Sequence, residues 1–316
     1  MVTFRMTTLY ITHPSYLEHD TGLGHPERPD RIRALEKALS HELFAGLKRE
    51  EAHKGDDEAI ARVHPTDYIE TLRSLAPDHG IIHVDGDTPM SPGTLNALYH
   101  GVGAVLRATD AVMEGEVANA FCGVRPPGHH AEPERAMGFC FFNNIAIAAQ
   151  HARARHGAER VAVVDFDVHH GNGTQAAFWS DRNLFYGSTH QMPLYPGTGH
   201  PSETGVAGNI VNAPLRAGDG GRQFRDAFLS RILPELAIFA PDLLLISAGF
   251  DAHRDDPLAS LELVEDDFSW ATYKLAEIAA KHAGGRVVSV LEGGYDLNAM
   301  ARSAGVHVRA LMDVGS

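Results

Sequence analysis

The residues best suited to chemistry follow a short apolar run near the middle of the chain, in the segment DFDVHHGNG. On an extended strand, residues two apart face the same side, so Asp165, Asp167 and His169 would align while the phenylalanine and valine between them pack on the other side. Buried carboxylates are costly unless they are paired or bound to a metal. Because a single Asp-x-His pair is more often a hydrogen-bonded structural pair than a ligand set, other residues must decide between the two.

A further aspartate, Asp251, follows another apolar run, LLLISAGF. Together, Asp167, His169 and Asp251 would supply three nitrogen and oxygen ligands and leave a fourth position for water. This is the layout of a catalytic zinc site rather than of a closed structural one. A ligand set without thiolate does not by itself exclude iron, cobalt or manganese.

Two other groups have the chemistry that a hydrolytic metal centre needs. His129 and His130 follow a Pro-Pro-Gly turn. Adjacent histidines are usually surface residues, but amide hydrolysis needs a base for the water and an acid for the amine. Tyr295 follows two glycines, and its phenol can donate a hydrogen bond to a developing oxyanion.

The elements that would position these groups alternate along the chain. Apolar or β-branched runs predict strands at Thr8–His13, Asn119–Val124, Arg160–His169, Leu184–His190, Leu243–Asp251 and Val287–Glu292. Helical periodicity predicts helices at Arg31–Leu47, Thr94–Met113, Asn143–His156, Arg222–Phe239, Asp266–His282 and Asn298–Met312. The alternation predicts an α/β fold with a mostly parallel sheet covered on both faces. Ligands bind beyond the carboxyl ends of such strands, where all the candidate groups lie.

Composition narrows the class of protein. The 316 residues are 44% apolar and 22% charged, and without linkers or repeats they predict one globular domain over 1–316. A net charge of -14 argues against a nucleic-acid surface and is compatible with cationic substrates. Two cysteines, no signal peptide and no apolar run long enough to cross a bilayer predict a cytoplasmic protein without a membrane partner. The oligomeric state is left open, a homo-oligomer included.

Six motifs together resemble one known family. RPPGHH, GFCFFNN, DFDVHHGNGTQ, YPGTG, SAGFDAHRDDPLA and EGGYDL are similar to the histone deacetylase family, nearest its class II members and the bacterial histone deacetylase-like amidohydrolases. The resemblance extends from GHPERPDRIRAL to EGGYDL and implies the three-layer α/β/α arginase–deacetylase fold. It implies a metal-dependent deacetylase acting on linear amides, with acetyl-lysine side chains of proteins or peptides as the first expected substrate.

The resemblance also assigns roles to the residues already noted. It implies one catalytic zinc ion held by Asp167, His169 and Asp251. His130 resembles the general base, which takes a proton from metal-activated water and returns it to the leaving amine. Tyr295 resembles the donor to the carbonyl oxygen.

Other positions carry over with supporting roles. His129 resembles the electrostatic partner of the base, and Asp165 stands where the family has its hydrogen-bonding carboxylate. Asn172 stands where class I relatives carry an aspartate. The substrate-binding positions implied are Gly138, Phe139, Tyr195, Leu258 and Arg31, the last lining the cavity through which acetate leaves. A monovalent-cation site, with K⁺ as structural ion, is implied at Asp165, Asp167, His169, Ser188 and Thr189.

Other functions remain open at this point. A deacylase of acetylated polyamines or other small amines would use the same site, and a catalytically silent acyl-lysine binder would share the fold. The silent binder is weakened as an alternative because every catalytic position carries the residue that catalysis needs. An arginase-like binuclear manganese hydrolase would need more bridging carboxylates. Polyamine deacetylases place a carboxylate at the tunnel rim, and one such position holds Leu258 here, although Asp87 or the wider acidic surface could substitute. This favours acetyl-lysine in peptides.

Overall fold

An eight-stranded parallel sheet forms the centre of the protein in a computed structural model, which describes residues 7–315. The strand order is β2-β1-β5-β10-β9-β6-β7-β8. The strands are β1 (Thr8–Thr12), β2 (Lys48–Glu51), β5 (Asn119–Cys122), β6 (Val161–Asp165), β7 (Leu184–Gln191), β8 (Ile210–Leu215), β9 (Leu243–Ala248) and β10 (Val287–Leu291). A small antiparallel pair, β3 (Ile82–Asp85) and β4 (Thr88–Met90), lies outside this sheet.

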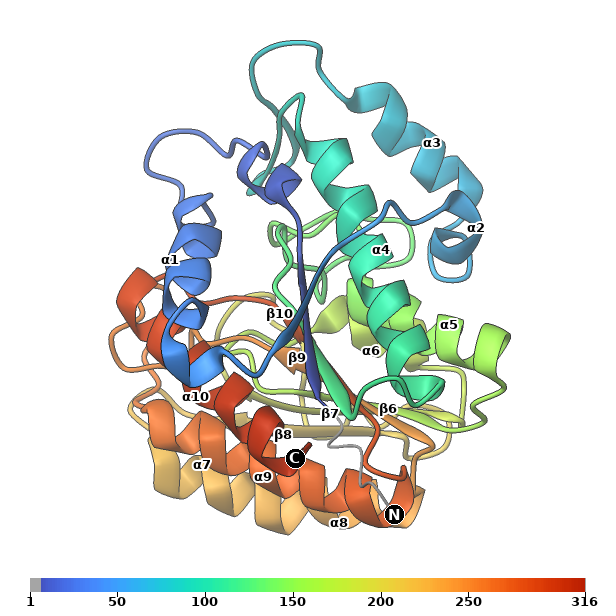
Figure 1. Cartoon of the computed structure of the whole chain (residues 1–316), viewed down its shortest axis with the longest axis vertical. Coiled ribbons are helices and arrows are strands. Elements are labelled where there is room, and N and C mark those ends of the chain that lie inside the picture. The colour runs from blue at the N-terminus through green and yellow to red at the C-terminus, as the bar shows by residue number, and fades with distance from the viewer. Residues whose placement is uncertain (1–6, 316) are drawn as a thin grey trace.

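Helices pack on both faces of the sheet, with α4 and α5 on one side and α7, α8 and α9 on the other (Figure 1). The long helices are α1 (Asp30–Leu39), α3 (Thr66–Leu75), α4 (Thr94–Met113), α5 (Asn144–His156), α9 (Glu265–His282) and α10 (Leu297–Val314). The shorter ones are α2 (Asp57–Ile60), α6 (Asn172–Phe178), α7 (Gly221–Ala227) and α8 (Leu233–Phe239). The central strands β5, β6, β9 and β10 are buried along their whole length. The predicted α/β class with a parallel, doubly covered sheet is confirmed.

One predicted helix is shorter than expected, and another is divided. The helix predicted at Arg31–Leu47 ends at Leu39, and a 3₁₀ turn follows at Glu42–Phe44. His41 adopts an extended backbone between them, and its ring accepts the N–H of Leu43, so the chain leaves the helix there. The helix predicted at Arg222–Phe239 is divided by a π-helical turn at Phe228–Ile232, just before a proline that has no N–H to donate.

The strand predicted at Arg160–His169 is also too long, because β6 ends at Asp165. Beyond it, side-chain carboxylates replace the neighbouring strand as hydrogen-bond acceptors. The N–H of Asp167 donates to Asp165 Oδ1 at 3.0 Å, and the N–H of Val168 donates to Asp251 Oδ1 at 2.9 Å. The predicted alternation nevertheless survives, since Phe166 and Val168 lie in the apolar core.

Among the described residues, no helix is both long and apolar enough to cross a membrane.

His307 is a fully buried histidine that joins three elements of the core. Its ring lies in α10, 2.7 Å from the hydroxyl of Thr272 in α9 and 2.8 Å from the hydroxyl of Ser289 in β10. Burial lowers the pKa of His307 from 6.5 to about 3. The folded protein therefore keeps this imidazole neutral at pH values where the unfolded chain protonates it.

This difference predicts a loss of stability in mild acid. Below about pH 6.5 the unfolded state binds a proton that the folded state excludes, so the free energy of unfolding should fall as the pH falls. For this group the slope approaches about 1.4 kcal/mol per pH unit. Urea unfolding followed by circular dichroism at pH 7.5 and 5.5, with chelator present throughout, measures it. His307→Gln should show a shallower decline, and an unchanged decline in that variant would contradict the assignment.

Candidate active site

Four neighbouring strands bring distant segments of the chain to one edge of the sheet. Strands β5, β10, β9 and β6 are adjacent and parallel, so their carboxyl ends lie together. The loops that follow them carry the two histidines after Pro-Pro-Gly, the Gly-Gly-Tyr segment, Asp251, and the Asp-Val-His-His segment respectively. The topology therefore assembles the four loops that the sequence had singled out.

Three of the predicted residues form a compact buried cluster. Ligand atoms of Asp167, His169 and Asp251 all lie within 4.8 Å of one another. His169 Nδ1 is 3.2 Å from Asp167 Oδ1 and 3.1 Å from Asp251 Oδ2. Asp167 Oδ2 accepts the N–H of Gly293 at 2.8 Å, which fixes that carboxylate from the β10 side. This set of one imidazole nitrogen and two carboxylates can hold a divalent metal ion.

The charges of the two carboxylates explain why a cation suits this place. Burial raises the pKa of Asp251 to about 7, and the nearby charge of Asp167 adds to the effect. Burial acts in the same direction on Asp167, but His129 and His169 outweigh it and hold the pKa of that carboxyl below its usual value. Two carboxylates so close together in a buried site repel each other when both are ionised. A divalent cation would remove that repulsion.

The tandem histidines lie beside this cluster, each oriented by a different partner. His129 Nδ1 is 3.0 Å from Asp165 Oδ2, and His130 Nδ1 is 2.8 Å from Asn172 Oδ1. The amide nitrogen of Asn172 donates to Glu132 at 2.8 Å, which fixes the amide with its oxygen toward His130. Because that oxygen can only accept, the proton of neutral His130 is on Nδ1, and Nε2 keeps its lone pair.

The two histidines differ in protonation. Burial opposes the charged form of His129, but Asp167 and Asp165 outweigh it and raise its pKa to about 10. Burial, together with the charges of His129 and His169, lowers the pKa of His130 well below 6.5. The centroids of the two imidazole rings are only 4.1 Å apart. The pair therefore combines one imidazolium with one neutral imidazole that can accept a proton.

A buried glutamate that the sequence analysis did not single out holds the turn before these histidines. Glu292 Oε2 accepts the N–H of Gly128 at 2.7 Å and that of His129 at 3.2 Å, while Oε1 accepts the Ser247 hydroxyl at 3.1 Å. Gly128 must be a glycine, since a Cβ there would lie 2.7 Å from the backbone nitrogen of Asn144. The only signal in the sequence was an acidic residue at the end of an apolar strand.

Asp256 supports the tyrosine in a similar way. Its Oδ2 accepts the N–H of Tyr295 at 2.6 Å, and its Oδ1 accepts the N–H of Leu258 at 3.0 Å. The sequence analysis also missed this residue, although it precedes Pro257 in a quoted motif. One carboxylate thus connects the loop after β9 with the loop after β10.

A cavity of about 200 Å³ opens onto these groups. It is lined by Asp87, His130, Gly138, Phe139, His169, Leu194, Tyr195, Leu258 and Tyr295. Four of the five predicted substrate-binding residues are among them. The rings of Phe139 and Tyr295 meet edge to face with centroids 5.8 Å apart, and Tyr195 is 38% exposed, which places it toward the solvent. The cavity therefore has aromatic walls and reaches His169 of the carboxylate–imidazole cluster.

Arg31, the fifth predicted residue, does not line this cavity. It is fully buried, with its guanidinium carbon 5.1 Å from the centroid of the Tyr295 ring. Its Nε donates to the carbonyl of Gly294 at 2.7 Å, and its Nη1 pairs with Glu27 at 3.1 Å. Arg31 therefore packs behind the Gly-Gly-Tyr loop.

The predicted monovalent-cation residues also lie near one another. Ser188 in β7 is in register with Asp165 in β6. The Ser188 hydroxyl lies 2.9 Å from His190 Nδ1, and the buried hydroxyl of Thr189 has no hydrogen-bond partner within residues 7–315. The predicted K⁺ site remains a prediction.

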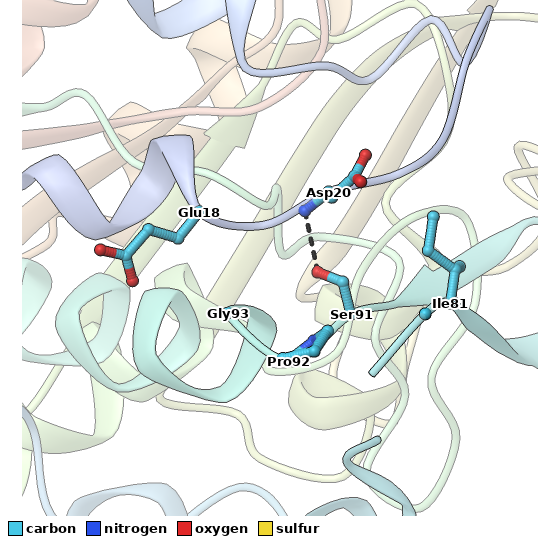
Figure 2. A pocket seen from close by; sticks show the side chains of 7 residues that line it. Glu18, Asp20, Ile81, Ser91, Pro92 and Gly93 are labelled. Carbon is cyan, nitrogen blue, oxygen red and sulfur yellow. Dashed lines mark hydrogen bonds between the residues drawn. The ribbon is translucent and has the colours of Figure 1, made fainter. Parts of the chain in front are cut away.

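A larger hollow of about 760 Å³ lies elsewhere and lacks comparable chemistry. It is lined by Glu18, Asp20, Gly80, Ile81, Ser91, Pro92 and Gly93, and Figure 2 shows the N–H of Asp20 donating to Ser91 Oγ, at 2.8 Å. Its titratable groups are the two carboxylates of Glu18 and Asp20, and its lining residues include no histidine that could join them as a metal ligand. The smaller cavity is the candidate active site.

Comparisons with known proteins agree with this geometry. The model of the histone deacetylase domain matches residues 25–311. A histone deacetylase-like amidohydrolase of Pseudomonas aeruginosa is 41% identical over 285 residues, which cover 89% of this chain and 75% of that protein. A probable deacetylase of Archaeoglobus fulgidus is 38% identical over 298 residues, which cover 92% of this chain and 82% of that protein. The crystal structure of the HDA15 HD domain matches with a TM-score of 0.92 at 33% sequence identity. The match covers 98% of this chain and 90% of that chain. The chain therefore belongs to the histone deacetylase family of hydrolases.

Proposed function

We propose that this protein is a zinc-dependent deacetylase that hydrolyses the side-chain amide of acetyl-lysine in peptides or proteins, within a single catalytic domain. One observation carries the proposal: a neutral histidine, a phenol and a member of the carboxylate–imidazole cluster line the same cavity of about 200 Å³. Base, oxyanion donor and metal ligand are the groups that amide hydrolysis at a metal centre needs. The relatives named deacetylases support the reaction class.

Asp167, His169 and Asp251 would hold the zinc ion, since their donor atoms are nitrogen and oxygen and their charges favour a cation. When bound there, zinc acts as a Lewis acid that polarises the substrate carbonyl and lowers the pKa of water to about 7. The remaining steps belong to side chains of the protein.

His130 is the proton carrier in this proposal. Its Nε2 lone pair accepts a proton from the attacking water, and the same atom later returns the proton to the lysine nitrogen as the amide bond breaks. The side-chain oxygen of Asn172 accepts the Nδ1–H of His130 at 2.8 Å and so holds the ring in place during both proton transfers. The imidazolium of His129 lowers the basicity of His130, so the acquired proton is readily given up to the amine.

Tyr295 is the oxyanion donor. Burial and the neighbouring charge of Asp251 raise the pKa of its phenol well above 10, so the hydroxyl keeps its proton. The proton is therefore available for a hydrogen bond to the carbonyl oxygen as negative charge develops on it. The Asp256 contact to the Tyr295 N–H fixes the backbone from which the ring projects.

The cavity walls support acetyl-lysine as substrate. Phe139 and Tyr195 would pack along the methylene stem. The Gly138 carbonyl, which accepts the Cys140 thiol at 3.3 Å, has a second lone pair that would accept the substrate N–H. Leu258 offers apolar contact at the cavity and no charge for a distant amine. Asp87 also lines the cavity, but its Oδ1 accepts the N–H of Gly138 at 3.0 Å. The acetylpolyamine alternative would depend on that carboxylate or on the wider acidic surface of the protein.

Metal dependence follows directly from the proposal. Dialysis against a strong chelator should abolish deacetylation of an acetyl-lysine peptide, and stoichiometric Zn²⁺ should restore it. Asp251→Asn should bind one equivalent of metal less than the wild type, by elemental analysis, and lose activity. Full activity after chelation, with no metal found in the protein, would exclude the metal mechanism.

The role of Tyr295 predicts a selective loss of turnover. Tyr295→Phe removes one hydroxyl and should lower kcat by about 100-fold, while metal content and folding stay unchanged. Tyr195→Phe, which removes a phenol without an assigned hydrogen-bonding role, is the matched control and should stay within a few fold of wild type. Near-normal turnover by Tyr295→Phe would remove the phenol from the mechanism.

Substrate class is tested by direct competition. We expect kcat/KM for an acetyl-lysine peptide to exceed that for acetylated spermidine or putrescine by at least about tenfold, a difference of roughly 1.4 kcal/mol in transition-state binding. Leu258→Glu should narrow the ratio by adding a carboxylate for the distant amine. A polyamine turned over equally well or better by the wild type would overturn the peptide preference and leave the metal mechanism intact.

A further inference from the structure

A second group of metal-binding side chains lies away from the active site. Asp110 is in the last turn of α4, and His151 and His156 are in the last two turns of α5. Ligand atoms of the three residues lie within 4.8 Å of one another. His151 Nε2 is 2.7 Å and His156 Nε2 is 2.6 Å from the same oxygen, Asp110 Oδ1. Two imidazoles and a carboxylate from two helices thus converge on one point.

Helix periodicity alone does not produce this convergence. Positions five residues apart are separated by roughly 140° around an α-helix, so the two histidines leave α5 on different sides. Their rings nevertheless turn toward one atom of another helix, with centroids 5.8 Å apart and planes at 75°. Gly157, in the left-handed conformation, ends α5 directly after His156. The three side chains therefore approach a common centre from three directions.

The donor set fits a zinc-class ion. Two imidazole nitrogens and one carboxylate oxygen are preferred zinc ligands, with bonds of about 2.0–2.1 Å that put neighbouring donors roughly 3.3 Å apart. The rings would have to withdraw from the carboxylate by roughly 0.7 Å, a small rotation for side chains at helix ends. The Asp110 side chain is 34% exposed, so water can complete the coordination.

The charge on Asp110 favours a cation as well. Burial raises the pKa of its carboxyl, but the hydrogen bonds from His151 and His156 outweigh burial and lower it below 3.8. The carboxylate is therefore ionised at neutral pH.

The guanidinium of Arg62 is a cation that opposes metal binding at this cluster. Its Nη1 lies 3.3 Å from His151 Nδ1, and its Nη2 pairs with Glu58 at 2.8 Å. When His151 Nδ1 accepts from Arg62, the proton is on Nε2 and points at Asp110. A metal on Nε2 needs the proton on Nδ1, so Arg62 must move aside. It can do so and still keep its ion pair with Glu58.

We propose that Asp110, His151 and His156 form a second divalent-cation site, of the zinc class, that ties the end of α4 to the end of α5. The site is independent of catalysis. Helix α5 begins at Asn144, next to the turn that carries Gly128, whereas His156 lies about 18 Å further along the helix axis. An ion bound here would stabilise the packing of the two helices without taking part in the reaction.

Counting bound metal tests the proposal. Zn²⁺ bound per chain is measured by equilibrium dialysis and elemental analysis, and Co²⁺ bound in its place is followed by visible absorption. His156→Ala should bind one equivalent less than the wild type, and the gain in Tm on adding Zn²⁺ should be smaller. Asp110→Asn, which keeps the shape of the side chain, should lose the same equivalent. His79→Ala, which removes an exposed histidine elsewhere, should bind as much metal as the wild type.

The outcomes separate this site from the active site. The comparison is a difference between variants, so it holds whether or not the active-site cluster is loaded. Deacetylation by His156→Ala should stay within about twofold of wild type, and Arg62→Ala should bind the additional ion several-fold more tightly. Equal metal content in wild type, His156→Ala and Asp110→Asn would show that the three residues form a hydrogen-bonded cluster only and would overturn the proposal.

Discussion

Two buried carboxylates, Asp167 and Asp251, create the constraint on which the active site depends. The parallel sheet places them at the ends of β6 and β9, which are neighbours in the sheet, and leaves both almost without access to solvent. Neighbouring negative charges in a medium of low dielectric are costly unless positive charge compensates them. His169 lies between the two carboxylates, and His129 stands on the far side of Asp167 at 3.8 Å. The protein thus surrounds the pair with groups that can carry positive charge, and the proposed metal ion would compensate the two carboxylates in the same way.

That arrangement also separates the two adjacent histidines. Because His129 lies between Asp165 and Asp167, its charged form is stabilised. His130 is turned away from those carboxylates toward the uncharged amide of Asn172, and its charged form is disfavoured. Identical side chains that are adjacent in the chain thereby acquire opposite protonation states, which is how one site can hold an electrostatic partner and a proton acceptor.

The sequence was sufficient for the parts of the structure that depend on local pattern. The helix predicted at Thr94–Met113 agrees at both ends, and the Asp-x-His spacing together with Asp251 identified the buried cluster. Within the eight-stranded sheet, the two strands that were not predicted, β2 and β8, are its edges. Strand β2 is KREE, with no apolar residue, and β8 contains Pro214, which an edge strand tolerates because one side needs no partner. The exposed strand β2 thus lacks the apolar run that burial imposes on the central strands, whereas in the buried strand β8 Asn212 and Pro214 interrupt that run.

What the sequence could not supply were contacts between segments far apart in the chain. Glu292 acts on amides that precede it by more than 160 residues, and no local pattern signals such a partner. Asp256 is similar, since its role depends on where the loop after β10 lies. These residues were identified only when the sheet order placed their loops together.

One kind of bond recurs along the carboxyl edge of the sheet: a carboxylate that accepts a backbone N–H where strand pairing stops. Asp165, Asp167, Asp251, Asp256 and Glu292 all do this. The edge would otherwise expose unpaired amides in a buried place, at a cost of about 1–3 kcal/mol each. Asp251 therefore serves the backbone with Oδ1 and faces the cluster with Oδ2, whereas Asp167 accepts a backbone N–H on each oxygen and also faces His169 with Oδ1. An alanine at position 251 would remove both functions, whereas an asparagine there keeps an acceptor for the amide and removes the charge. Loss of metal binding can therefore be distinguished from loss of the loop structure only with the isosteric amide.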